Sequence, residues 1–173
     1  MVIIESLNKF TTFSEGIEID ELISSRGCKH IPISSKEFDK DGVFFQTRAK
    51  IIWDPYPESF CISPPDRILN SIYDFEMRVL QIIGDESEKY FGKFIPHDII
   101  KKENFVSVTG NDKKFLKLKI SEELGISPNK GDLVDIIVGF RKFYIGRNKK
   151  VNLFLCIEKI RKIEENNYAF LDD

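Results

Sequence analysis

The sequence lacks any run of about 18 apolar residues, the length a helix needs to cross a membrane, so we expect no membrane span. The first ten residues, MVIIESLNKF, have no basic segment and only a short apolar one, so we expect no secretory signal peptide. The three cysteines, Cys28, Cys61 and Cys156, are odd in number and far apart. This favours a reduced, intracellular compartment over a disulfide framework.

The chain also lacks the local motifs of common catalytic and metal sites. It has no glycine-rich phosphate loop and no Ser-His-Asp or Cys-His arrangement at a recognisable spacing. Cys28-Lys29-His30 offers two metal ligands, but the other Cys and His residues stand at none of the usual ligand spacings. Asp132 and Asp135 flank apolar residues at a strand start, where carboxylates are usually surface charges rather than an acid and a base. We therefore expect a non-catalytic protein without a metal site or a cofactor.

Neither sign of charge is in large excess, because 26 Lys and Arg against 28 Asp and Glu leave a net charge of −2. That balance argues against a general nucleic-acid binder, but the distribution along the chain is uneven. Residues 113–162 carry 13 Lys and Arg against 5 Asp and Glu, a net charge of +8, and the remainder has a net charge of −10. We expect one positive surface on an otherwise acidic molecule. The alternative, charges scattered over a solvated exterior, stays open at this stage.

The most regular pattern lies in residues 131–163. Apolar residues alternate with others at a period of two in 133–140 and again in 151–158, which predicts two strands. Gly146 and Asn148 lie between the two runs and allow the positive φ of a tight turn, so we predict a long hairpin. Its tip combines cations with rings: Arg141, Lys142, Phe143, Tyr144, Arg147, Lys149 and Lys150.

Two further predicted strands carry cations and a ring on their outward face. In residues 43–53 the outward set is Phe44, Gln46, Arg48 and Lys50, and the inward set is Val43, Phe45, Thr47, Ala49, Ile51 and Trp53. In residues 113–120 the basic stretch contains Lys113, Lys114, Phe115, Lys117 and Lys119, with Leu116, Leu118 and Ile120 pointing inward. For Phe44 alone, a ring covered by the N-terminal arm is the favoured alternative to a stacking role.

The middle of the chain predicts helices and connections. Residues 54–65 hold four of the seven prolines, which predicts a connection rather than a strand. Ser63, followed by two prolines, predicts a helix start, and apolar residues at helical spacing continue over 66–83 until Gly84. A strand over 73–83 is the weaker alternative. A short helix over 96–102 and a short strand over 106–108 complete this region.

The two ends of the chain differ in character from its centre. Residues 1–42 are poorly periodic and predict an arm with one or two short strands, ahead of a core over 43–163. Residues 164–173 are acidic with two embedded rings, which predicts a mobile tail. Such a tail could compete for a basic groove or recruit a replication partner, and a frayed end is the equally favoured alternative.

Three predicted strands thus repeat one composition, outward cations beside an aromatic ring. Lysine and arginine neutralise phosphates, and rings stack on unpaired bases, so the combination favours single-stranded over duplex nucleic acid. The sequence shows no recognition helix with a basic face, which weakens a duplex-reading alternative. The candidate binding residues are Phe44, Arg48, Lys50, Lys113, Lys114, Phe115, Lys117, Lys119, Arg141, Lys142, Phe143, Tyr144, Arg147, Lys149 and Lys150.

A series of features in order resembles a known family. Phe45-Gln46-Thr47 lies on an early strand, Tyr90-Phe91-Gly92-Lys93 follows the helix, and the basic strand 115–120 precedes the glycine-led hairpin 131–162. In this the chain resembles the OB-fold-like single-stranded-DNA-binding proteins of large nucleocytoplasmic DNA viruses. The resemblance covers residues 43–163. It implies a viral protein that acts in DNA replication, recombination or repair inside the infected host cell, at the replication site.

The sequence therefore predicts an α+β fold: an OB-like β-barrel or strongly curved antiparallel sheet, with the helix 66–83 and one short helix packed on it. The predicted function is non-catalytic, largely sequence-independent binding of single-stranded DNA, through phosphate contacts and base stacking. A viral structural or protein-interaction module that uses the same sheet face is the alternative, and RNA is a third, weaker one. The sequence leaves the oligomeric state open, a homo-oligomer included.

Overall fold

The computed structural model describes residues 17–19, 21–35, 43–52, 59–109, 114–120, 125 and 128–163. Its strands are β1 (Ile17–Ile19), β2 (Ile23–Ser25), β3 (Cys28–Ser35), β4 (Val43–Ile51), β5 (Ser59–Ser63), β6 (Phe105–Val106), β7 (Leu116–Ile120), β8 (Leu133–Ile145) and β9 (Val151–Lys162). Its helices are α1 (Asp66–Asp85), α2 (Ser87–Phe91) and α3 (His97–Ile99), which runs into a π-helical turn, η2 (Ile100–Asn104). Lys113, Trp53 and the predicted tail 164–173 lie outside the described residues.

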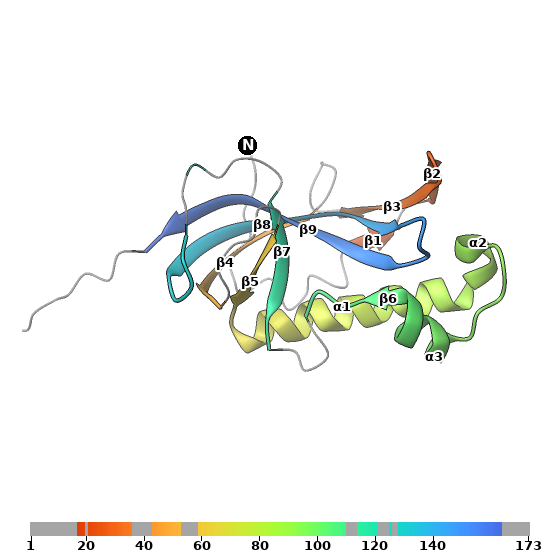
Figure 1. Ribbon diagram of the computed structural model, residues 1–173, viewed down its shortest axis with the longest axis horizontal. Helices are drawn as coiled ribbons and strands as arrows, with labels where there is room; N and C mark the ends of the chain where they lie inside the picture. Colours follow the sequence, from red (N-terminus) through yellow and green to blue (C-terminus); the bar gives the residue numbers. More distant parts are fainter. Residues whose placement is uncertain are drawn as a thin grey trace, which may run out of the picture.

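Five of these strands close into a barrel (Figure 1). The strands β4, β5 and β7 pair in turn as an antiparallel meander, and β7 pairs in parallel with β9. The ring closes because β8 pairs antiparallel with both β9 and β4. A closed, five-stranded barrel with one parallel pair and added helices confirms the predicted α+β, OB-like fold.

β8 is long enough to serve two neighbours on one edge. Its first eight residues pair with β4, from Leu133 opposite Lys50 to Phe140 opposite Val43. Its last residues pair with β3, where Ile145 lies opposite Lys29. β1 and β2 in turn pair with β3, so the N-terminal region contributes three strands, and β3 has eight residues rather than being short.

The predicted hairpin is confirmed as β8 and β9, but its register shifts at two bulges. The second shift lies between Phe140 and Lys142, and it leaves both Arg141 and Lys142 off the inner face. Beyond it Phe143 pairs with Leu153 on the inside and is 0% exposed. Because a bulge adds one residue to one strand, it reverses the alternation that the sequence predicts. The predicted stacking role of Phe143 is therefore wrong.

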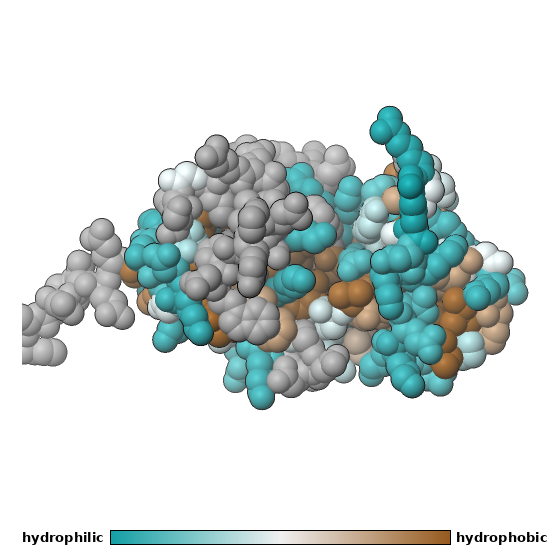
Figure 2. Space-filling view, viewed as in Figure 1, coloured by the Kyte–Doolittle hydropathy of each residue, from teal (hydrophilic) through white to brown (hydrophobic). Residues whose placement is uncertain are grey.

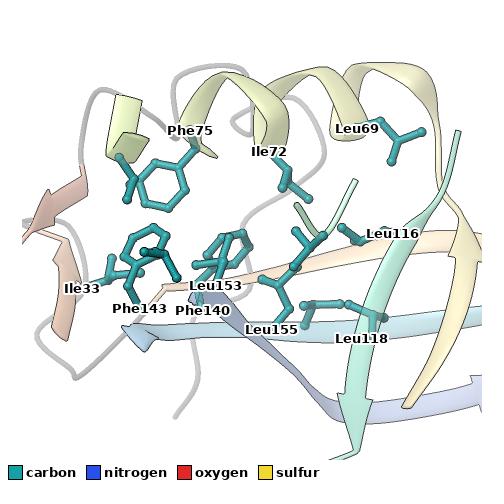
Figure 3. Close-up of a cluster of buried hydrophobic side chains, with 14 of the residues drawn as sticks. Ile33, Leu69, Ile72, Phe75, Leu116, Leu118, Phe140, Phe143, Leu153 and Leu155 are labelled. Atoms are coloured by element: carbon teal, nitrogen blue, oxygen red, sulfur yellow. The ribbon is translucent and has the colours of Figure 1, made fainter. Parts of the chain in front are cut away.

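The long helix α1 lies along the barrel and the β8–β9 ribbon and covers the core from one side (Figure 1). Its apolar residues recur at helical spacing and are buried: Ile68, Leu69, Ile72, Phe75, Val79, Leu80 and Ile83. The ring of Phe75 packs against the rings of Phe140 and Phe143, with centroids 5.7 and 5.6 Å away (Figure 3). None of the described helices is both long and apolar enough to pass through a bilayer.

Three details around α1 correct the sequence predictions. Residues 59–63 form the strand β5 rather than a connection, and Ser63 is its last residue. The residue before the helix is Pro65, and no side chain caps the first turn. Gly84 lies inside the last turn instead of ending the helix, which continues to Asp85. The prolines on both sides of β5 favoured the prediction of a connection, and the five residues of the strand alternate too little to predict a strand.

The rest of the helical region is close to prediction. The short helix expected over 96–102 is found as α3 followed by η2. The short strand expected over 106–108 is found as the two-residue β6, Phe105–Val106, and shares only Val106 with the prediction. The five-residue helix α2 was not predicted. It ends at Gly92, whose φ of 75° is a left-handed conformation that glycine adopts at little cost.

A buried carboxylate ties α1 to the loop after β6. Glu76 is 0% exposed and accepts hydrogen bonds from the Ser107 hydroxyl at 2.8 Å, the Val108 N–H at 2.6 Å and the Thr109 hydroxyl at 3.0 Å. Burial raises the pKa of Glu76 and the hydrogen bonds partly offset that rise. The same loop is also bonded to β7: the Val108 carbonyl accepts a hydrogen bond from the Lys117 N–H at 2.8 Å.

Candidate nucleic-acid interface

The outward side chains of β4, β8 and β9 form rows across the barrel, because strand side chains alternate and neighbouring strands are in register. One row joins Arg48, Asp135 and Arg161. The Asp135 carboxylate accepts from Arg48 at 3.0 and 3.2 Å and from Arg161 at 2.7 Å. The Arg48 hydrogen bond is the main reason why the pKa of Asp135 lies below its usual value. We call the outward surface of β4, β8 and β9 the barrel wall.

Further along the barrel wall, Gly139 makes room for two neighbours. A Cβ at this position would lie 2.7 Å from the Glu158 carboxylate and 3.1 Å from the Phe44 ring. Glu158 accepts from the Arg141 guanidinium at 3.0 Å, and that guanidinium also lies 5.3 Å from the centroid of the Phe44 ring. Phe44 is 7% exposed and lies under Arg141, so its place among the candidate binding residues is wrong and the favoured alternative, a covered ring, holds, with Arg141 covering it.

Cys156 of β9 marks the point where cations of its two neighbouring strands, β7 and β8, approach one another. It faces outward between Gly139 of β8 and Lys119 of β7, yet it is buried. Burial raises the pKa of its thiol, as does the Glu158 charge, and the charges of Arg141, Lys119 and Lys142 lower it in part. Those three predicted cations therefore lie around one spot of the outer surface. Lys119 extends the barrel wall onto β7.

The remaining predicted residues of β4 and β7 are placed less favourably. Lys50 is exposed at the end of β4, one row beyond Arg48. Lys117 is exposed on β7, opposite Cys61 of β5 and two residues before Lys119. Lys114 is exposed and Phe115 is half-buried, both just ahead of β7.

Other cations gather where β8 turns into β9, beyond the barrel. Arg147 donates to the Arg26 carbonyl of the β2–β3 turn at 3.0 Å, and Lys150 donates to the Glu103 carbonyl of η2. The side chain of Asn104 donates to the Lys149 carbonyl at 3.0 Å. Hydrogen bonds to backbone thus hold three turns together: 26–27, 146–150 and the end of η2. We call this assembly the tip.

The tip cations differ from those of the barrel wall in their partners. In the described part of the chain no carboxylate pairs with Arg26, Arg147 or Lys149: the Arg147 guanidinium donates to the Arg26 carbonyl, and the Lys149 carbonyl accepts from Asn104. Arg26 and Lys149 also have positive φ, 49° and 61°, a conformation that costs a non-glycine residue about 1 kcal/mol or more. The turns therefore hold charged residues in place at some cost in stability.

Tyr144 lies between the barrel wall and the tip. Its hydroxyl is hydrogen-bonded to the Cys28 thiol at 3.0 Å, which is the main reason why the pKa of Tyr144 is raised. Its ring lies 5.3 Å from that of His30 and is half-buried. Burial, and secondarily the charge of Lys142, lower the pKa of His30. Tyr144 is thus partly enclosed by β3 instead of standing open for a base.

One ring that the sequence prediction missed is exposed at the tip end of the molecule. Phe94, between α2 and α3, is 70% exposed, the largest value among the large apolar side chains of the described residues. It lies in an aperiodic loop, where alternation gives no signal. The available signal was the sequence Gly92-Lys93-Phe94-Ile95-Pro96, since Gly and Pro mark a loop and loops lie on the surface.

Within the described residues, no group of three His, Cys, Asp or Glu side chains is close enough to hold a metal ion. The sequence matches no model of a known protein family, and no curated protein matches it either. The chain's function is therefore inferred from its barrel and from the charges that the barrel wall and the tip carry.

Proposed function

We propose that this protein is a non-catalytic single-stranded-DNA-binding protein with little sequence preference. The observation that carries the proposal is the alignment of cations on β4 and along the β8–β9 ribbon, from the barrel wall to the tip: Arg48, Arg161, Lys159, Arg141, Lys142, Arg147 and Lys149. Cations in a track suit a phosphodiester backbone, and OB barrels commonly bind oligonucleotides, which is support by fold analogy.

The burial of Phe44 and Phe143 changes the balance of the proposed mechanism. Phosphate neutralisation provides most of the affinity, and stacking depends on rings other than these two. The resemblance to single-stranded-DNA-binding proteins of large DNA viruses supports a role in replication, recombination or repair at the replication site of an infected cell. RNA remains the closest alternative ligand, because phosphate contacts do not read the 2′-hydroxyl.

A structural or protein-interaction module is the second candidate, and the ion pairs of the barrel wall favour it. Arg141 pairs with Glu158, and Arg48 and Arg161 both pair with Asp135. Cations that are already paired with carboxylates gain less free energy from binding a polyanion. The barrel wall could instead meet the surface of another protein, which also presents both signs.

Fluorescence anisotropy at two salt concentrations distinguishes the two candidates. Labelled oligo-dT, oligo-U and a duplex of equal length are titrated with the protein. We expect oligo-dT to bind more tightly than duplex, with log affinity falling against log salt by about 0.7 per phosphate contact. Absence of binding to all three probes at low salt would exclude the proposal and leave the interaction module.

A further inference from the structure

Phe94 is held outward by a loop that is fixed on its N-terminal side. The Gly92 N–H donates to the Glu88 carbonyl at 2.8 Å, which closes α2 with a left-handed cap. The Ile95 N–H donates to the Ser87 hydroxyl at 3.0 Å, and the Ile95 side chain is buried. The residues on both sides of Phe94 are thus bonded back to α2, and the ring between them points to solvent.

The C-terminal side of the loop is fixed by His97. Its ring packs so closely on Gly84 of α1 that a Cβ there would lie 2.5 Å from the imidazole. The His97 Nε2 also lies 3.1 Å from the Asp85 carboxylate. A ring that is exposed on a loop fixed at both ends loses little conformational freedom when a ligand covers it, which favours binding.

The Phe94 loop lies beside the tip. The Lys29 amine on β3 donates to the Tyr90 carbonyl at 2.6 Å and so fixes α2 next to the end of β8. On the other side of the loop, η2 is bonded to the β8–β9 turn through Asn104 and Lys150. The loop therefore spans two elements that are each attached to the tip. Figure 2 shows apolar surface bordered by hydrophilic surface at the end of the molecule that carries α2 and α3.

The cations near this loop have no carboxylate partner among the described residues. They are exposed and come from the loop, from η2 and from the β8–β9 turn: Lys93, Lys101, Lys102, Arg147 and Lys149. Exposed carboxylates lie on the same side of the molecule, Glu88 on α2, Asp98 on α3 and Glu103 on η2, so the cations of the β8–β9 turn are the ones that favour a phosphate. An exposed ring beside uncompensated cations matches an unpaired base followed by its phosphates. A protein ligand would need a wide apolar contact area around the ring, and besides Pro96 the exposed neighbours of Phe94 in its loop and at the start of α3 are the charged Lys93 and Asp98.

We propose that Phe94 is the base-stacking residue of this protein and that the tip cations hold the phosphates on either side of the stacked base. The inference rests on the proposed function. It assigns to Phe94 the selection of single strands, with unpaired bases, over duplex. Duplex hides its base faces, so only a single strand can use Phe94. The strand then extends from the barrel wall to the tip along the β8–β9 ribbon.

The test compares Phe94→Ala, Phe94→Leu and Phe94→Trp with the wild type, using oligo-dT and duplex probes. We expect Phe94→Ala and Phe94→Leu to lose about tenfold to hundredfold in oligo-dT affinity, with an unchanged salt slope because no phosphate contact is removed. Duplex affinity and the melting temperature should stay as in the wild type. Val106→Ala, which truncates another exposed apolar residue, is the matched control and should bind normally.

Phe94→Trp gives a direct reading of stacking. Its fluorescence should be quenched as oligo-dT is added, beyond any change in the wild type, whose one Trp is Trp53. If the wild type binds oligo-dT and Phe94→Ala binds equally well, the stacking assignment is overturned and the proposed function stands. If the wild type binds no oligonucleotide, both are overturned, and a protein partner that requires Phe94 becomes the explanation of its exposure.

Discussion

The barrel wall and the tip lie on the same β8–β9 ribbon, but they compensate their cations differently. On the barrel wall, Arg141 forms an ion pair with Glu158, and the Asp135 carboxylate pairs with the guanidinium groups of both Arg48 and Arg161. At the tip, Arg147 and Lys150 donate to backbone carbonyls, which carry no net charge. A phosphate that reaches Arg48, Arg141 or Arg161 has to displace a carboxylate, whereas one that reaches Arg147 at the tip meets a guanidinium that is bonded only to a backbone carbonyl. A count of lysines and arginines therefore overestimates the positive charge that the barrel wall offers to a phosphate and underestimates the relative contribution of the tip.

This difference also assigns separate roles along a bound strand. Exposed ion pairs contribute about 0–1 kcal/mol each, so the barrel wall can exchange its partners at small cost. The tip is held in its geometry before any ligand arrives, and the positive φ values of Arg26 and Lys149 show that this geometry is maintained against local strain. We expect the tip to dominate initial binding and the barrel wall to add affinity for longer strands.

The largest expected effect comes from removing the core support beneath the tip end of the ribbon. Phe143→Ala should lower the free energy of unfolding by about 3–5 kcal/mol, because a fully buried ring between β8 and α1 is lost. Denaturant unfolding followed by circular dichroism measures it, with Phe143→Leu as a milder control. A variant that unfolds like the wild type but no longer binds oligo-dT would place this ring outside the core.

Charge removal tests the comparison itself. The double variant Arg147→Ala with Lys149→Ala should reduce oligo-dT affinity about tenfold or more and lower the salt slope by about 1.4, the value for two phosphate contacts. The matched pair on the barrel wall, Arg141→Ala with Lys159→Ala, should have the smaller effect, because Arg141 already has a carboxylate partner. An equal loss of oligo-dT affinity in the two double variants would contradict the proposed difference between the barrel wall and the tip.

Neutralising a carboxylate of the barrel wall should improve binding. Glu158→Gln frees Arg141 and removes one negative charge, so we expect oligo-dT to bind a few-fold more tightly at low salt, since one exposed pair contributes about 1 kcal/mol or less. Asp74→Asn, on the exposed face of α1, removes the same charge elsewhere and serves as the control. If both variants bind alike, only the net charge matters and the pair has no specific role.

The smallest effect concerns acid stability. The pKa of Asp135 is lowered in the folded state, chiefly by Arg48, so its contribution to stability is present above the unfolded pKa of about 3.9 and is lost as pH falls through the lower folded value. Asp135→Asn should cost about 1 kcal/mol at pH 7 and flatten the decline of stability below pH 4. Unfolding curves between pH 2 and 7 measure it, and a variant with the same acid decline as the wild type would contradict the assignment.

Local periodicity was enough to predict much of this fold. Residues close in sequence determine the alternation in a strand and the spacing in a helix. The elements predicted in this way, β4, β7, β8, β9 and α1, are all present. Periodicity left a closed barrel and a strongly curved sheet as alternatives, and the OB-like prediction came from the family resemblance; the parallel pairing of β7 with β9, which closes the ring, has no local signal. The prediction was least accurate where one residue changes the phase, as the bulge after Phe140 does for Phe143.

The candidate site was harder to predict, because exposure depends on contacts that are distant in sequence. Phe44 is outward by alternation, but Arg141, 97 positions later, covers it. Glu158 and Asp135 neutralise cations on neighbouring strands, which a linear count of charge does not show. Phe94 went unnoticed since its loop has no periodicity and its exposure depends on bonds made by Ser87 and His97.

The order of pairing in the barrel has a consequence for how the chain is made. β4 pairs over eight residues with β8, but with β5 over only two, so most of its ladder waits for a partner that lies more than 80 positions later. At a synthesis rate of about 5–20 residues per second, β8 emerges roughly 4 to 17 seconds after β4. During that interval the inward residues of β4 and an open strand edge are available to other nascent chains. The β8–β9 hairpin, by contrast, has its partner within a few residues and closes in microseconds, so the newly synthesised protein exposes the edge of β4 far longer than the edges of the hairpin.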